Sequence, residues 1–376
     1  MSVSYRTYDR NDRRSVRPRR RWPIVLPLAL VVLLAAGWSG VWFYAAGRAQ
    51  TEFAAWRAKQ AAAGRVVSCS REEFAGFPFR FELRCAETAL SLQKARLSFA
   101  AKDMLAAVQI YQPTLAIAEF TGPLTITEEN QGGVALDWAL AQASVRGLPA
   151  PERVSFVLDQ PTLKPLAGND QIANAAHAEV HVRAAPHLPQ DPPALDLSVT
   201  LAQALFPGIA RMPNVPLDAN VTTTLRGISS LTPKPWPQVL RDLQAANGEL
   251  EVRQARIQQG DIVGVGRGTL KLTARGMLDG QIDLTVAGME QLMVALGIDQ
   301  KVGQASQRAL DRYVPGLNLD RLLGPRGNAA IAAAGAAMLG QPAELEGRRA
   351  VALPLRFVDG VVFLGPLRVS EMQPLF

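Results

Sequence analysis

The sequence predicts a mainly β protein, with an antiparallel sheet that is extended or curved, held to a membrane by one N-terminal transmembrane helix. Three observations lead to this fold class. A long uncharged stretch lies near the N-terminus, period-two alternation of apolar and polar residues dominates after residue 65, and prolines and glycines interrupt that alternation at short intervals. Several helices are expected to pack on the sheet.

The first element is a membrane anchor over residues 22–47, which contain no charged side chain. As a helix, residues 24–44 would span about 32 Å, close to the ~30 Å of a hydrocarbon core. Aromatic residues mark both ends of this stretch, as in membrane proteins: Trp22 at one end and Trp38, Trp42 and Tyr44 at the other. Cleaved signal peptides have shorter apolar cores of about 7–15 residues. We therefore expect an uncleaved anchor.

The net charge of +7 comes almost entirely from the residues before the anchor. Residues 1–21 hold eight arginines and two aspartates, a balance of +6, which leaves +1 for the rest of the chain. The remainder therefore offers no basic surface for nucleic acid. Arginines directly before a membrane span favour a cytoplasmic N-terminus, and binding of anionic lipid headgroups is a second role open to them. The eight are Arg6, Arg10, Arg13, Arg14, Arg17, Arg19, Arg20 and Arg21.

This topology places the N-terminus in the cytoplasm and the chain after residue 47 outside it, in an oxidising compartment such as a periplasm. The only two cysteines, Cys69 and Cys85, agree with an exported body. A turn at Gly76-Phe77-Pro78 would place them directly opposite each other in a hairpin, at a separation suited to a disulfide. A metal or redox site is the weaker interpretation, since two cysteines give too few ligands and the CxxC spacing is absent.

Further along, residues 48–64 read as a juxtamembrane helix that extends the anchor and ends at Gly64. Strands with one buried face follow, as in the alternation of Leu195, Leu197, Val199 and Leu201 with polar residues. Helices are expected over 234–248, 288–297, 303–314 and 327–339. The body is large for one core, so we expect either one elongated sheet or two β-rich subdomains, 65–230 and 231–376, the second with most of the helices.

Two Asp-Gly pairs predict hairpin turns. Asp359-Gly360 lies between two apolar runs and predicts a two-residue loop. For Asp279-Gly280, a two-residue loop would mix the two faces of the hairpin. A three-residue loop, 278–280, would instead pair Leu284 with Ala274 and Val286 with Leu272, with Gly280 in a left-handed conformation.

No catalytic, cofactor-binding or metal-binding motif is found, and no cofactor is expected. Gly264, Gly266 and Gly268 share one face of a predicted strand. They predict either sheet curvature or a packed helix on this face, or one wall of a groove for an elongated apolar ligand. Of the three histidines, His177 and His181 lie with Glu179 on one strand face, too far apart to share an ion easily, and the third is His187.

Several of these features together resemble a family of uncharacterised bacterial proteins, DUF2125. The features are an anchor ending in aromatics, a helix bearing Trp56, GFPFR at 76–80 between the cysteines, and DGVVFLGPLRV at 359–369. The resemblance covers nearly the whole chain and implies an inner-membrane protein facing the periplasm, with no catalytic residues to transfer. The run of glycines and leucines over 264–280 is also similar to β-repeats of AsmA-like envelope proteins.

Three functions are compatible with this sequence. The leading hypothesis is a non-enzymatic envelope protein that binds or shields lipid or another apolar ligand. A scaffold or interaction module of an envelope complex is the alternative, with an envelope protein as its partner. An unrecognised hydrolase is the third. The sequence identifies neither the ligand nor the oligomeric state.

Overall fold

The computed structural model describes residues 22–129, 132–148, 150–168, 170–186, 192–208, 214–228, 231, 236–289, 291–292, 340–365 and 367–376. The arginines before residue 22, His187 and the predicted helices over 303–314 and 327–339 lie outside this part of the chain. Two compact units are distinguished, Met1–Phe53 and Ala54–Phe376.

The anchor and the juxtamembrane segment form one helix, α1, over Trp22–Ala62. The segment Val25–Ala62 contains a stretch long and apolar enough to cross a membrane, and its most apolar 18 residues have a mean hydropathy of 2.0. Large apolar side chains along it are exposed, among them Leu26, Leu33 and Val41. Beyond Ala62 the backbone turns at Gly64, whose φ of +80° suits glycine. The predicted extension of the anchor helix beyond residue 47 is thus confirmed, and the helix ends at Ala62, two residues before the predicted end at Gly64.

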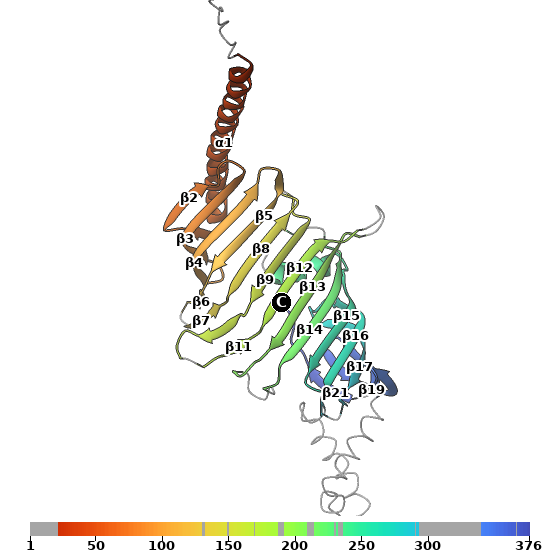
Figure 1. Ribbon diagram of the computed structural model, residues 1–376. Coiled ribbons are helices and arrows are strands. Elements are labelled where there is room, and N and C mark those ends of the chain that lie inside the picture. The colour runs from red at the N-terminus through yellow and green to blue at the C-terminus, as the bar shows by residue number, and fades with distance from the viewer. Residues whose placement is uncertain are drawn as a thin grey trace, which may run out of the picture. The chain divides into compact units, whose positions relative to one another are not determined.

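Antiparallel strands make up the rest of the described chain, in agreement with the predicted fold class (Figure 1). The first ten are β1 Arg65–Ser68, β2 Arg71–Ala75, β3 Arg80–Leu92, β4 Leu97–Gln109, β5 Gln112–Thr121, β6 Leu124–Glu128, β7 Gly132–Asp137, β8 Leu140–Arg146, β9 Arg153–Asp159 and β10 Thr162–Pro165. The remainder are β11 Ala173–Asn174, β12 His177–Ala184, β13 Ala194–Ala204, β14 Leu217–Arg226, β15 Glu249–Gln259, β16 Ile262–Leu272, β17 Leu278–Ala287, β18 Gln341–Leu345, β19 Arg348–Val358, β20 Val361–Leu364 and β21 Leu367–Glu371.

The strands form one sheet in which neighbours in the chain are mostly neighbours in space. From one edge the main order is β2, β3, β4, β5, β8, β9, β12, β13, β14, β15, β16, β17 and β19. β1 also pairs with β3, along a different part of it from β2, and β18 and β20 pair with the side of β19 that faces away from β17. β14 pairs with β15 across the boundary predicted near residue 230. One sheet therefore runs through both proposed halves, and their division into subdomains stays a prediction.

A line of backbone interruptions crosses the N-terminal part of the sheet. The breaks lie at 122–123 between β5 and β6, at 138–139 between β7 and β8, at 160–161 between β9 and β10, and at 175–176 between β11 and β12. On one side of this line the sheet contains β5, β8, β9 and β12, and on the other side it contains β6, β7, β10 and β11. Trp138 stabilises this line by donating its indole N–H to the carbonyl of Phe120 at 2.8 Å. The sheet bends further along the order, where β15 to β19 turn out of the plane of β5 to β13 (Figure 1).

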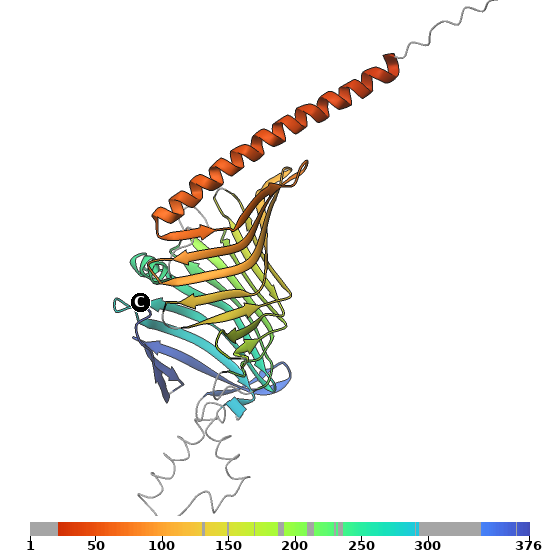
Figure 2. The same ribbon diagram turned by 90° about the vertical axis from the view of Figure 1, so that its left-hand side faces the viewer.

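Two helical segments lie at the C-terminal part of the sheet. α2, Trp236–Ala245, confirms the helix predicted over 234–248, and its buried residues are Leu240 and Leu243. It contacts β16 and lies on one side of the sheet (Figure 2). Of the helix predicted over 288–297, the structure describes a turn in which the N–H of Leu292 donates to the carbonyl of Gly288. Met289 from this turn joins Val286, Leu353 and Leu364 in the largest buried cluster of the described chain.

The two Asp-Gly predictions have different outcomes. Asp359-Gly360 does connect β19 to β20 as a two-residue loop, with Val358 paired to Val361. The loop predicted at 278–280 is wrong, because these residues belong to β17 and Gly280 pairs with Leu270. The true loop is 273–277, where the Thr273 side chain accepts the N–H of Met277 and Gly276 supplies the positive φ, +72°. Leu284 and Val286 consequently pair with Gly266 and Gly264.

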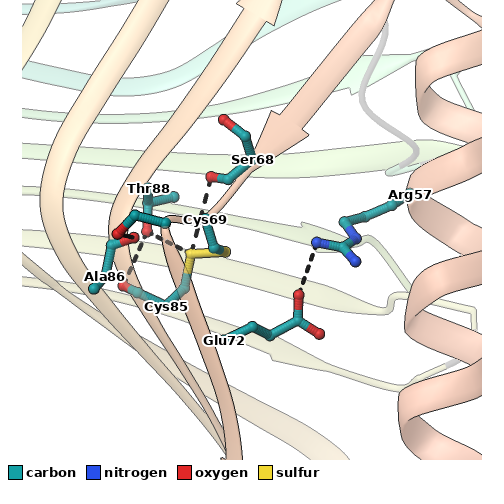
Figure 3. The surroundings of a disulfide bond; sticks show 8 residues. Arg57, Ser68, Cys69, Glu72, Cys85, Ala86 and Thr88 are labelled. Carbon is teal, nitrogen blue, oxygen red and sulfur yellow. Dashed lines mark hydrogen bonds and ion pairs between the residues drawn. A yellow bond between two sulfur atoms is a disulfide. The ribbon is translucent and has the colours of Figure 1, made fainter.

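The disulfide between Cys69 and Cys85 forms, with the two Cα atoms 5.3 Å apart (Figure 3). The prediction that the cysteines lie directly opposite each other is wrong, since Cys85 pairs with Glu72. Cys69 instead lies in the break between β1 and β2, where it reaches across to β3. Glu72 bonds Arg57 of the helix end at 2.7 Å, so the same corner of the second unit carries a covalent and an ionic connection.

Removal of the disulfide should lower the free energy of unfolding. In the chain-entropy model, closing a loop of this length contributes about 3 kcal/mol. We expect the double variant Cys69→Ala/Cys85→Ala to unfold at a lower urea concentration than the oxidised wild type. A reducing agent should lower the wild-type midpoint similarly and leave the variant unchanged. Equal midpoints for variant and wild type would contradict the prediction.

Candidate functional site

The two faces of the sheet differ in chemistry because the strands alternate strictly. In β12, for example, Ala178, Val180 and Val182 point to one face, while His177, Glu179 and His181 point to the other. The register then decides whether the apolar residues of neighbouring strands meet. Since a slip of one residue would exchange the faces, a continuous apolar surface needs correct pairing at every strand.

The pairing brings the apolar residues into one unbroken line, which we call the central row. It contains one residue from each of thirteen successive strands, each directly paired with the next, and every one is apolar or glycine. The central row is Phe74, Leu83, Ala106, Ala118, Ala143, Phe156, Val180, Val199, Val221, Ala255, Gly266, Leu284 and Leu353.

Rows on both sides of the central row have the same character. One runs from Cys85 through Met104, Phe120 and onward to Val351, and is apolar throughout. The other runs from Phe81 to Leu364 and has a single polar member, Thr223, whose buried hydroxyl has no hydrogen-bond partner. The three rows together form a band, called the apolar band below. Sequence reasoning found its strands individually and missed their alignment.

Coverage of the apolar band is uneven along its length. At the β16 to β19 end, Met289 and Leu292 pack on it and bury Val286 and Leu353. Near the middle, among the described residues, Phe156 is 38% exposed and Val180 is 36% exposed although they are cross-strand partners. Large apolar side chains that line up and stay exposed mark a surface for an apolar partner or ligand.

The predicted glycine stripe lies within this band, opposite the bulky residues of β17. A Cβ at Gly266 would lie 2.7 Å from Cδ2 of Leu284, and one at Gly268 would overlap the carbonyl oxygen of Gln281. A Cβ at Gly264 would meet nothing closer than 4.0 Å. The contacts at Gly266 and Gly268 come from the neighbouring strand β17 and not from the helix that was one expected alternative. The stripe by itself therefore forms no groove at these two positions.

This difference between glycines is testable. Gly268→Ala should destabilise the protein by about 1–3 kcal/mol, because the new methyl group meets rigid backbone. Gly264→Ala is the matched control on the same strand face and should leave stability unchanged or slightly higher. Urea midpoints of the two variants measure the effect. Equal midpoints would show that β17 does not approach β16 as closely as described.

The polar face carries the histidines in a network of ion pairs. Nδ1 of His177 lies 2.6 Å from a carboxylate oxygen of Asp159, and Nε2 of His181 lies 3.1 Å from Glu179. The hydrogen bond to Asp159 raises the pKa of His177 above its ordinary value, and the hydrogen bond from His181 lowers the pKa of Glu179. Within the described ranges no group of three or more His, Cys, Asp or Glu side chains is placed to hold a metal ion. The absence of a metal stays a prediction.

The predicted rim aromatics all lie on α1. Trp22 begins the helix, and Trp38 and Tyr44 are 41% and 78% exposed. The distance from Trp22 to Tyr44 along the axis is about 33 Å at 1.5 Å per residue. This is close to the ~30 Å of a hydrocarbon core, so the aromatic residues at the two ends fall near its two boundaries. The helix can therefore serve as a membrane anchor.

Comparison with known proteins gives one family. A family model described as an uncharacterised protein conserved in bacteria, DUF2125, matches residues 42–373. No curated protein and no solved structure matches the chain. The similarity of 264–280 to AsmA-like repeats stays a prediction. The match begins within α1 and ends beside the last strand, so the chain belongs to the DUF2125 family.

Proposed function

We propose that this protein holds lipid acyl chains on the apolar band of a body tethered to the bacterial inner membrane. α1 crosses the membrane once, with residues 1–21 in the cytoplasm and the second unit in the periplasm. The arginines before the helix and the disulfide after it support this orientation. The role is binding rather than catalysis.

The continuous apolar band carries this proposal. The twelve spacings between thirteen strands, at about 4.8 Å each, give the central row a length of about 58 Å along the sheet, more than the ~30 Å core of a bilayer. Burying one phenylalanine or valine side chain contributes about 1.5–3 kcal/mol. Because Phe156 and Val180 are 38% and 36% exposed, a ligand that covers them gains part of this free energy at each, and a long apolar ligand can add such contributions along the band.

The chemistry of the band favours an acyl chain over a protein partner. Protein interfaces carry about one hydrogen bond per 100–200 Å² and place polar residues among the apolar ones. Over its three rows the described band offers one side-chain hydroxyl, that of Thr223. A hydrocarbon chain needs no hydrogen bonds, and the anchor holds the body beside a bilayer that supplies such chains. The scaffold function remains the competing outcome of the test.

A charge placed in the band should abolish lipid binding. Phe156 is in the central row, and Ser144 lies on the neighbouring strand, where it faces the opposite side of the sheet. We expect native mass spectrometry of the full chain to show at least about tenfold less bound phospholipid for Phe156→Asp, because a carboxylate is costly to bury against hydrocarbon. Ser144→Asp should bind as much phospholipid as the wild type. Lipids that surround α1 contribute equally to the signal of both variants, so the difference reports on the band.

Two results would count against the proposal. Equal lipid occupancy in Phe156→Asp and Ser144→Asp would show that the band does not hold the lipid. Crosslinking that joins the wild-type band to one envelope protein, lost in Phe156→Asp, would assign the band to a scaffold instead. Circular dichroism of both variants confirms that each is folded.

A further inference from the structure

A row of like charges crosses the polar face, on the side of the sheet away from the apolar band. Arg146, Arg153 and Arg183 are directly paired on β8, β9 and β12. All three side chains are exposed. Like charges directly opposite each other destabilise a sheet, so an anion bound beside three in line would relieve their repulsion. The row ends at one carboxylate, that of Asp196 on β13.

Asp196 is already saturated with donors. It is only 7% exposed, and Arg183 donates from Nε and Nη2 to one oxygen at 3.1 and 3.0 Å. The other oxygen accepts from Nη2 of Arg253 at 2.7 Å and from the hydroxyl of Thr224 at 2.9 Å. Arg253 comes from a break in the register of β15, between Val252 and Ala255, and such irregularities redirect side chains.

The carboxylate of Asp196 is bonded by Arg183 and Arg253, and by neither Arg146 nor Arg153. Among the residues that the structure describes, neither Arg146 nor Arg153 forms an ion pair. Beside them lies a depression of about 340 Å³. Its lining includes the guanidinium groups of Arg153, Arg183 and Arg253 and the hydroxyls of Ser155, Ser198 and Thr222, together with His181 and Leu197. The one carboxylate in its lining is that of Asp196.

We propose that this depression, with Arg153 in its lining, binds a phosphate-type oxyanion. The three lining arginines and Asp196 leave a local charge of +2, with the histidines neutral. A phosphate group carries about −1.5 to −2 at neutral pH, whereas a carboxylate would leave the site positive. Guanidinium groups suit phosphate because they can donate two parallel hydrogen bonds to it. The site is separate from the acyl-chain function and does not depend on it.

The experiment uses the full chain in nanodiscs of uncharged lipid. Sodium phosphate at fixed ionic strength should raise the thermal midpoint of the wild type above that in sodium chloride. Arg153→Gln should weaken phosphate binding at least about tenfold, because it removes a charge-assisted contact. Lys164→Gln removes an exposed positive charge outside the depression and should bind phosphate normally. Without phosphate, Arg153→Gln should be at least as stable as the wild type, since it relieves repulsion along the row.

A second probe distinguishes the source of the phosphate. Vesicles of phosphatidylcholine with and without phosphatidic acid present the same group on a lipid. Arg153-dependent binding of inorganic phosphate assigns a soluble ligand, and Arg153-dependent binding of phosphatidic acid vesicles alone assigns a lipid headgroup. The proposal is overturned if the wild type binds neither probe, or if Arg153→Gln and wild type bind the probes equally.

Discussion

The register of antiparallel pairing is the constraint on which the rest of this structure depends. Alternation along a single strand gives that strand one apolar side, but thirteen strands share an apolar band only if each pair is in phase. The same register aligns Arg146, Arg153 and Arg183 on the other side of the sheet. A hydrophobic surface and a charged row are thus two consequences of one set of backbone hydrogen bonds.

The sequence predicted what depends on local pattern. The anchor helix, α2, the Asp359-Gly360 hairpin and the pairing of Cys69 with Cys85 all follow from composition, spacing and turn residues. It failed where several registers satisfy the same pattern. The loop expected at 278–280 lies at 273–277. Both alternatives keep Leu284 on the same face, because alternation cannot distinguish registers that differ by an even number of residues. The Thr273 side chain and Gly276 decide between them.

Most of the candidate site was beyond such reasoning because it consists of contacts between distant strands. Phe156 and Val180 are unremarkable in their own segments, and their importance comes from being partners in an exposed part of the band. Asp196 and Arg253 meet only because β15 has an irregular register beside β14. The glycine stripe was visible in the sequence. The sequence paired Leu284 and Val286 of β17 with Ala274 and Leu272, however, whereas the structure pairs them with Gly266 and Gly264.

The central claim is that acyl chains lie on the apolar band in the cell. Site-specific photo-crosslinking tests it most directly, with a benzophenone amino acid placed at Val180 in the band and, separately, at Ser144 on the polar face. The account predicts that irradiation of living bacteria gives a phospholipid adduct at Val180, seen as a mass increase of the intact chain, and none at Ser144. A protein adduct without lipid at Val180, or equal lipid adducts at both positions, would contradict it.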